Sequence, residues 1–303
     1  MEYIAILAFL LGLPFTYTQL EVKKIENKYP PLGYFKNIDG YNIHYTDIGS
    51  GQPVVLLHSQ PANERQFDLL KNKLKENYRV ISIDRPGMGY SEGPKINSSE
   101  RLFLQAEIIS KLLDEIIDEK PIVVGHSYGG ALALSLALYE EKNIKKLILV
   151  NTVSHPWKGD GVWLPFKIIT NPLIGKIFSQ TYAMIYGKSV IDRSADDNFP
   201  DNKPTPGFVN RVGAELTLRP ASLESYALDA INLKSSLSKQ YKKYENLSIP
   251  ITILAGIGDR VTPNNTHSFQ LHKDIKHSKL IELNNVEHSI PELNPMKIIE
   301  QIQ

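Results

Sequence analysis

Four short apolar runs in the first half of the chain lack polar alternation. Each is rich in β-branched residues, as is typical of strands buried on both faces of a parallel sheet. These runs are residues 53–59, 79–85, 121–127 and 145–151. The segments between them place apolar residues three and four positions apart, which predicts amphipathic helices over 63–78, 98–119 and 128–141. The order predicts an α/β fold with a mostly parallel, doubly wound sheet.

Two further patterns complete this organisation. Residues 33–49 alternate apolar and polar positions around Asp39-Gly40, which predicts a β-hairpin. The strand–helix alternation stops at about residue 154 and resumes near 233, so a helical insertion interrupts the domain and is expected to cover the sheet as a lid. The expected units are an N-terminal hydrophobic segment (1–20), a linker (21–32), the first part of the core (33–153), the lid (154–232) and the second part of the core (233–303).

The N-terminal segment has no charged residue between Glu2 and Glu21. Residues 3–20 are long enough to span a bilayer, so we expect a membrane anchor, with a cleaved signal peptide or a buried or interfacial helix as alternatives. Three lysines follow the segment, and the positive-inside tendency then leaves the globular part in the cytoplasm. A cleaved signal would place it outside the cell or in the periplasm instead.

Composition narrows the classes of partner and chemistry. A net charge of +1 and the lack of basic stretches interleaved with aromatic residues argue against nucleic-acid binding. The chain has no cysteine, which excludes disulfides, thiolate metal ligands and a cysteine nucleophile. The expected partner is a small-molecule substrate, with no metal and no cofactor, and the sequence leaves the oligomeric state open.

The stretch GHSYG, residues 125–129, matches the GxSxG pattern at the end of a predicted strand and the start of a predicted helix. Glycines on both sides allow a very sharp turn, from which a serine oxygen can project alone above the sheet edge. Ser127 is therefore the candidate nucleophile.

A serine hydroxyl needs a histidine base that is itself oriented by a carboxylate. Asp259 follows one late strand and His288 follows the next, so the chain order is serine, acid, histidine. Glu287 is a rival acid, but chain neighbours project differently, and we expect it to face away from the histidine ring. Residues 151–153, after an earlier strand, offer no carboxylate.

An acyl-transfer site also needs donors for the oxyanion. The backbone amide after the nucleophile, that of Tyr128, is the first candidate, and the amide of Gln60, in the loop after residues 53–59, is the second. Aromatic residues of the insertion are candidates for the substrate pocket, namely Trp157, Trp163, Phe166 and Tyr182.

With these motifs together, the chain resembles the α/β-hydrolase superfamily, in particular lidded single-domain members whose early strand ends in HGxP and whose next loop reads DxPGxGxS. Here these motifs stand as HSQP (58–61) and DRPGMGYS (84–91), followed by GIGD (256–259) and the late histidine. The apolar leader also resembles that of bacterial members with an N-terminal membrane segment. The resemblance implies that Asp84 and Arg85 have structural roles. One position departs from the pattern, because Ser59 replaces the family's glycine after the histidine.

These features predict a serine hydrolase that cleaves a carboxylic ester through an acyl-enzyme on Ser127. Related branches with epoxide hydrolase or haloalkane dehalogenase activity use an aspartate nucleophile, so the serine argues against them. C–C bond, amide and lactone hydrolysis and perhydrolase activity stay open, because the lid decides among them. A hypothesis from another class is a membrane-tethered, non-catalytic ligand-binding scaffold.

Overall fold

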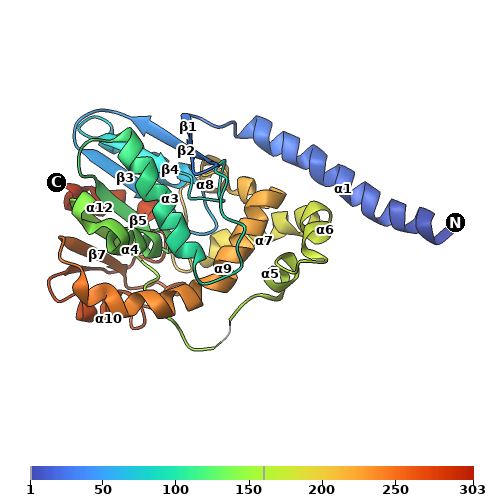
Figure 1. Ribbon diagram of the computed structural model, residues 1–303. Coiled ribbons are helices and arrows are strands. Elements are labelled where there is room, and N and C mark those ends of the chain that lie inside the picture. Colours follow the sequence, from blue (N-terminus) through green and yellow to red (C-terminus); the bar gives the residue numbers. More distant parts are fainter. Residues whose placement is uncertain (1, 160) are drawn as a thin grey trace.

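The computed structural model describes the backbone of residues 2–159 and 161–303, and the side chains of 10–159, 161–191, 193 and 198–303. An eight-stranded sheet forms the centre of the molecule, in the spatial order β1-β2-β4-β3-β5-β6-β7-β8 (Figure 1). Its strands are β1 (Tyr34–Ile38), β2 (Tyr41–Ile48), β3 (Pro53–Leu57), β4 (Arg79–Ile83), β5 (Ile122–His126), β6 (Lys146–Val150), β7 (Ile251–Gly256) and β8 (Lys279–Leu283).

The sheet is antiparallel only at the β1–β2 hairpin and where β2 pairs with β4. All other neighbours are parallel. The hairpin turn is the predicted Asp39-Gly40, and both residues have positive φ (50° and 87°), as a tight two-residue hairpin turn requires. The predicted mostly parallel α/β sheet is confirmed.

Helices cover both faces of the sheet, because successive strand residues point to opposite faces. In β3, Val55 and Leu57 belong to the apolar layer that includes α3 (Arg101–Ile116), α4 (Tyr128–Glu140) and α10 (Ser268–Asp274). Val54 and Leu56 belong to the opposite layer, with α2 (Asp68–Leu74) and α12 (Pro295–Ile302). The short helix α11 (Ile290–Leu293) leads into α12. Two buried apolar layers therefore hold the strand ends in place.

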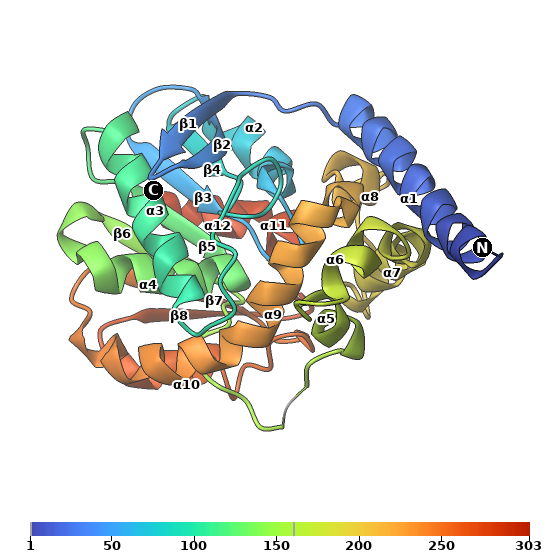
Figure 2. The ribbon, with the colours of Figure 1, turned by 45° about the vertical axis from the view of Figure 1, so that its right-hand side comes forward.

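The insertion between β6 and β7 consists mainly of helices, and its last helix continues past residue 232, where the predicted insertion ends. It comprises α5 (Leu164–Ile169), α6 (Gly175–Gln180), α7 (Ala183–Asp197), α8 (Phe208–Arg211) and α9 (Pro220–Gln240). Short 3₁₀ helices lie at 64–67, 141–143, 214–218 and 241–246. The long helix α9 runs along the boundary between the sheet domain and helices α5–α8 (Figure 2).

The structure differs from the prediction in the segment 21–32, which was expected to be a linker. Helix α1 (Glu2–Lys28) continues through most of it, and Ile25 and Tyr29 pack against Met184, Leu216 and Leu218 of the insertion region. Two glutamates of this segment have distant partners, since Glu21 pairs with Lys188 and Glu26 with Arg219.

The predicted membrane anchor finds no support in the structure. In the part of the chain that the structure describes, no helix is long and apolar enough to cross a membrane. The side chains of residues 1–9, on which much of that prediction rests, lie outside the described residues.

Candidate active site

The strand–helix turn predicted at GHSYG is present. Strand β5 ends at His126, α4 begins at Tyr128, and Ser127 between them has φ 54° and ψ −116°. A positive φ strains a residue with a side chain and persists only where surrounding packing enforces it. A Cβ on Gly129 would lie 2.0 Å from the carbonyl oxygen of Leu57, and one on Gly125 would lie 2.5 Å from that of Gly129. Packing thus explains both glycines and holds Ser127 in the strained turn.

Asp259 and His288 meet at the same edge of the sheet. Asp259 follows β7, His288 follows β8, and the distance from His288 Nδ1 to Asp259 Oδ2 is 2.9 Å, with both side chains buried. The Asp259 carboxylate also accepts hydrogen bonds from the Thr262 hydroxyl (2.6 Å) and from two loop amides.

The charge state of Asp259 sets the tautomer of His288. Burial by itself would raise the pKa of Asp259, but the interaction with His288 and the bonds from Thr262 outweigh it, so the pKa lies below its ordinary value. An ionised carboxylate only accepts, so Nδ1 of His288 carries the proton and Nε2 of the neutral ring has a free lone pair.

His126, directly before Ser127, contacts His288. The two ring centroids are 4.9 Å apart, and His126 Nε2 donates to the carbonyl oxygen of His288 at 2.8 Å. Burial, and to a smaller extent the neighbouring His288, lowers the pKa of His126 to about 3, so the His126 ring is neutral.

Within the described residues no hydrogen bond joins the Ser127 hydroxyl to the His288 ring. Catalytic hydrogen bonds are often long before substrate binds.

Asn151, which follows β6, holds the acid and histidine loops together. Its side-chain amide donates to the carbonyl oxygens of Glu287 (2.7 Å) and His288 (2.9 Å), and its Oδ1 accepts from the Gly256 amide (2.8 Å). Its backbone is in the left-handed region, with φ 40°. In the sequence, residue 151 was noted only because it is not a carboxylate. The contacts of Asn151 could not be predicted, because they join three segments that are far apart in the chain.

Glu287, the rival acid, has its carboxylate bound by residues of the insertion. Its carboxylate accepts from the side chain of Asn202 (2.7 and 2.8 Å) and from the amide of Asp201 (3.1 Å), both in the insertion. Glu287 therefore ties the insertion to the histidine loop, and Asp259 is the acid that contacts His288.

The loop that contains Gln60 starts beside the turn at Ser127, since a Cβ on Gly129 would lie 2.0 Å from the carbonyl oxygen of Leu57 and 2.6 Å from that of His58. Among the described residues, the backbone amides of Gln60 and Tyr128 donate to no protein acceptor. The Gln60 side chain donates to the carbonyl oxygen of Tyr226 in α9 (2.8 Å), which fixes this loop against the insertion.

Ser59 is accommodated without the glycine that the family pattern has there. Its φ is not positive. The side-chain amide of Gln66 accepts from the Ser59 amide and donates to the Ser59 hydroxyl, both at 2.8 Å. Gln66 therefore compensates for this departure from the family pattern.

A buried polar network supports the same loop. Arg85 donates to the carbonyl oxygens of His58 (2.9 Å) and Ser59 (3.2 Å), and its guanidinium lies 4.2 Å from the centre of the Tyr128 ring. Asp229 of α9 accepts from Arg85 (3.3 Å), and also from Arg101 and Gln105 at 2.6 and 2.7 Å. The network joins the β3 loop, the start of α4 and the insertion. In the sequence, only the motif DRPGMGYS pointed to it, because the family resemblance implied a structural role for Arg85.

Of the four aromatic candidates, Trp163 and Phe166 pack edge-on against each other, with ring centroids 5.3 Å apart, whereas Trp157 and Tyr182 have other partners. The Trp157 ring packs edge-on against His267, and Phe166 packs edge-on against Tyr226, the residue that holds Gln60. The Tyr182 hydroxyl donates to the carbonyl oxygen of Leu10 in α1 (3.0 Å), and Trp163 is half exposed. Phe166 is thus the member of this set closest by contact to the β3 loop.

A second Ser–His–Asp chain, which sequence analysis did not single out, lies nearby. His155 contacts the Ser154 hydroxyl (2.8 Å) through Nδ1 and Asp274 (2.7 Å) through Nε2. Ser154 is fully buried, has no strained backbone, and also donates to the carbonyl oxygen of His267 (3.2 Å). A packed serine with these partners is a structural group.

In the described part of the chain, no three His, Asp or Glu side chains are grouped so as to hold a metal ion.

Comparisons with known proteins agree with this architecture. Residues 52–167 match the family model described as "alpha/beta hydrolase fold". The chain is 25% identical over 278 residues to the uncharacterized hydrolase YugF of Bacillus subtilis, which covers 88% of this chain and 94% of the relative. It is also 25% identical over 238 residues (75% and 78% of the two chains) to the 2-hydroxy-6-oxononadienedioate/2-hydroxy-6-oxononatrienedioate hydrolase of Comamonas testosteroni.

Among solved structures, the esterase EaEST from Exiguobacterium antarcticum superposes with a TM-score of 0.69 at 25% identity, covering 89% of this chain and 98% of that chain. The chain has the α/β-hydrolase fold. Together, the matches support a hydrolase enzyme of the α/β-hydrolase superfamily.

Proposed function

We propose that this chain is a serine hydrolase that cleaves a carboxylic ester or a related acyl compound through an acyl-enzyme on Ser127. The observation that carries the proposal is the Asp259–His288 hydrogen bond of 2.9 Å, at the sheet edge where Ser127 is held in a strained turn. The order of the three residues and their strand-end positions are those of a nucleophile elbow with its base and acid.

In the first step, Nε2 of His288 takes the Ser127 proton, and the serine oxygen attacks the substrate carbonyl carbon. Asp259 keeps the proton on Nδ1 and stabilises the positive charge that then forms on the ring. The backbone amides of Gln60 and Tyr128 donate to the tetrahedral oxyanion, a role that fits their lack of acceptors among the described residues.

In the second step, His288 gives its proton to the leaving alcohol, and the acyl group stays on Ser127. His288 then deprotonates a water that attacks the acyl carbon, and the acid product leaves as Ser127 is protonated again. Each proton moves through one ring nitrogen, so no metal or cofactor is needed for these steps.

The helical insertion is proposed to act as the lid. It contacts the histidine loop through Asn202 and the β3 loop through Tyr226. Phe166 and Tyr226 then form part of the pocket wall, so the insertion selects the acyl group.

A second candidate reaction is hydrolysis of a C–C bond in a 2-hydroxy-6-oxo dienoic acid, the kind of compound that the name of the relative from Comamonas testosteroni contains. Amide or lactone hydrolysis and perhydrolase activity use the same Ser127 and fall within this proposal. The non-catalytic scaffold is the rival outside it.

The test is hydrolysis of p-nitrophenyl esters with acyl chains from C2 to C12 by the wild-type protein and the Ser127→Ala variant. We expect a rate that needs Ser127 and a chain-length profile that reports the pocket size. A folded wild-type protein that turns over a 2-hydroxy-6-oxo dienoic acid but no ester would favour the C–C hydrolase. Turnover of none of these substrates, together with no labelling by a fluorophosphonate, would favour the scaffold.

A further inference from the structure

The two backbone amides proposed as oxyanion donors belong to peptide units that are held in different ways. The Tyr128 N–H shares its unit with the Ser127 carbonyl, whose oxygen accepts from three backbone amides at 3.0–3.3 Å. Backbone groups alone therefore orient this unit. The Gln60 N–H shares its unit with the Ser59 carbonyl, and within the described residues no backbone amide donates to that oxygen.

Side chains hold the Ser59 carbonyl instead. The Arg85 guanidinium donates to it at 3.2 Å, and to the preceding carbonyl, that of His58, at 2.9 Å. The His58 ring also donates to the Ser59 carbonyl, from Nδ1 at 2.8 Å, because its Nε2 accepts from the Arg85 backbone amide (3.0 Å). Both donors to this oxygen therefore depend on Arg85.

The position of this carbonyl determines the direction of the Gln60 N–H. The peptide bond between Ser59 and Gln60 is trans. A trans peptide unit is planar and rigid, and its C=O and N–H bonds point in opposite directions. When the Ser59 oxygen is bound to Arg85, the Gln60 N–H must point away from Arg85.

The Arg85 guanidinium has little freedom to move. It is fully buried, lies 4.2 Å from the centre of the Tyr128 ring, and donates to Asp229 of α9 at 3.3 Å. The same helix contacts the loop a second time, because the carbonyl oxygen of Tyr226 accepts from the Gln60 side chain (2.8 Å). Helix α9 thus contacts the loop on the side chain of Gln60 and, through Arg85, on its backbone.

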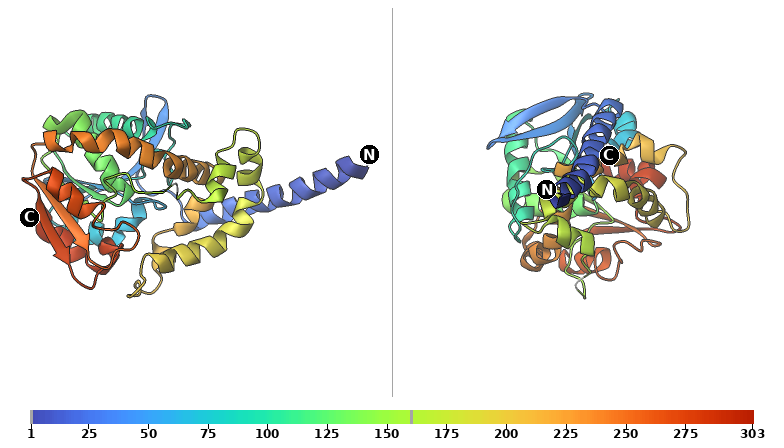
Figure 3. Two further views of the ribbon diagram at one scale, coloured as in Figure 1. Left: turned by 90° about the horizontal axis from the view of Figure 1, so that it is seen from below. Right: turned by 90° about the vertical axis from the view of Figure 1, so that its right-hand side faces the viewer.

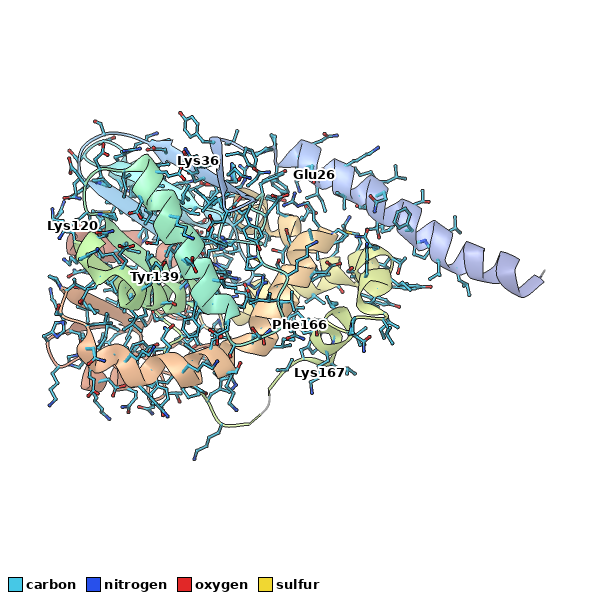
Figure 4. All side chains as sticks on the ribbon, in the orientation of Figure 1. Glu26, Lys36, Lys120, Tyr139, Phe166 and Lys167 are labelled. Atoms are coloured by element: carbon cyan, nitrogen blue, oxygen red, sulfur yellow. The ribbon has the colours of Figure 1, made fainter. Side chains whose placement is uncertain are left out.

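Helix α9 is itself held between the sheet domain and the insertion. It passes beside α3, whose Arg101 and Gln105 donate to Asp229 at 2.6 and 2.7 Å (Figure 3, left). On its other side, Tyr226 packs edge-on against Phe166 of α5, with ring centroids 4.6 Å apart (Figure 4). The carboxylate that binds Arg85 therefore has a fixed place.

We propose that Arg85 is a positioning residue for the proposed hydrolysis, because its guanidinium holds the Ser59 carbonyl so that the Gln60 N–H points toward the oxyanion. This inference rests on the proposed function, since an oxyanion forms only if Ser127 attacks a carbonyl carbon. A donor that is fixed in advance needs no reorganisation as the negative charge develops. Arg85 then acts on the chemical step and has little effect on the binding of substrate.

The test compares Arg85→Met with the matched control Arg101→Met. Each variant removes one buried guanidinium and leaves Asp229 paired with the other arginine, so the losses of folding stability should be similar. Only Arg85→Met loses the donors to the carbonyls of His58 and Ser59. Circular dichroism and thermal melting compare the folding of both variants with the wild type.

With p-nitrophenyl butyrate, Arg85→Met should lower kcat at least about tenfold and keep KM within about threefold, because a donor is misdirected. Arg101→Met should keep both constants within about threefold. A second readout is the ratio of kcat/KM for this ester to that for its thiono analogue, in which sulfur replaces the carbonyl oxygen. Sulfur accepts hydrogen bonds weakly, so this ratio should fall in Arg85→Met only.

Arg85→Lys is the variant for the case that Arg85→Met does not fold. Lysine keeps the charge next to Asp229 but lacks the planar fork that reaches two carbonyl oxygens and a carboxylate together. It should lower kcat at least about fivefold, again with KM little changed.

Equal kcat in the folded Arg85 and Arg101 variants, or an unchanged ratio of ester to thionoester, would overturn this inference and leave the proposed function in place. A wild-type protein without Ser127-dependent turnover of any acyl substrate would overturn both. The wild type and Ser127→Ala therefore tell the two failures apart before the arginine variants are measured.

Discussion

At the carboxyl edge of the sheet, buried polar groups are paired with one another, whereas the outer side of the insertion exposes large apolar groups. Asp259 and Asp229 are buried and accept hydrogen bonds from several donors each, and the buried Asn151 side chain donates two and accepts one. Leu173 and Ile174, in contrast, are 83% and 51% exposed. A buried polar group is costly unless it is bonded, so the first arrangement fixes geometry. An exposed apolar group contributes little to folding and is available for a contact with another surface.

The largest effect is expected for Ser127, at the carboxyl edge of the sheet. Ser127→Ala should lower kcat for an ester on the order of 10⁴-fold or more, because no other group replaces the nucleophile. Steady-state kinetics with p-nitrophenyl butyrate measure it. Ser154→Ala is the matched control, since Ser154 also contacts a histidine, and it should keep kcat within about tenfold. A large loss in Ser154→Ala with activity kept in Ser127→Ala would reverse the assignment.

The next effect concerns the buried charge of Asp229. Asp229→Asn leaves Arg85 and Arg101 without a carboxylate and should lower the free energy of unfolding by about 3 kcal/mol. Urea denaturation measures this change. Asp201→Asn removes an exposed pair with Arg260 and should cost less than about 1 kcal/mol. Equal losses in the two variants would contradict the importance given to burial.

A smaller effect is expected at the clamp between the loops. Asn151→Ala removes the donors to the carbonyl oxygens of Glu287 and His288 and should lower kcat about 10- to 100-fold, with KM little changed, since His288 loses its position. Asn151→Asp keeps an acceptor for Gly256 but lacks those donors, so it should lose nearly as much. Full activity of either variant would show that the loops hold their places without the clamp.

Stability should also depend on pH through His44. Burial by itself lowers the pKa of His44, but the bond to Asp84 (2.7 Å) and a carbonyl oxygen on the other ring nitrogen hold it above its ordinary value. The charged pair therefore stabilises the fold below about pH 6.5. This contribution is lost as pH rises through the raised pKa. Between pH 6 and 9 the wild type should lose more unfolding free energy than His44→Gln. Parallel profiles in urea denaturation would contradict this.

The smallest effect is expected on the outer side of the insertion. Leu173→Ser should change the free energy of unfolding by less than about 0.5 kcal/mol and leave turnover of a soluble ester unchanged. Leu56→Ala in the sheet core is the comparison and should cost about 3 kcal/mol, because Leu56 is fully buried. A similar loss in both variants would mean that the Leu173 side chain is packed against other parts of the chain.

The parts of the fold that follow local rules were predictable from sequence. Buried strands read as unbroken β-branched runs, and the glycines at 125 and 129 marked a turn whose close packing the structure explains. The positions of Asp259 and His288 followed from parallel strands, whose carboxyl ends meet at one edge.

Contacts between distant segments of the chain could not be predicted from the sequence. Glu21 and Glu26 lie in a segment that was predicted as a linker, and their partners Lys188 and Arg219 are far along the chain. The roles of Asn151 and Gln66 depend on which backbone groups of neighbouring loops lie beside them. The spacing of residues in the sequence does not predict this. The partners of the four aromatic candidates could not be predicted for the same reason, because tertiary packing sets the directions of side chains in the helical insertion.

The central claim is that Ser127 becomes acylated during turnover. Its most direct test is to quench the wild-type protein with acid during hydrolysis of a p-nitrophenyl ester and to locate the added acyl mass by peptide mass spectrometry. The account predicts an adduct on the peptide that contains Ser127, absent from Ser127→Ala and present in Ser154→Ala. Sustained wild-type turnover with an adduct elsewhere, or unchanged turnover by Ser127→Ala, would contradict it.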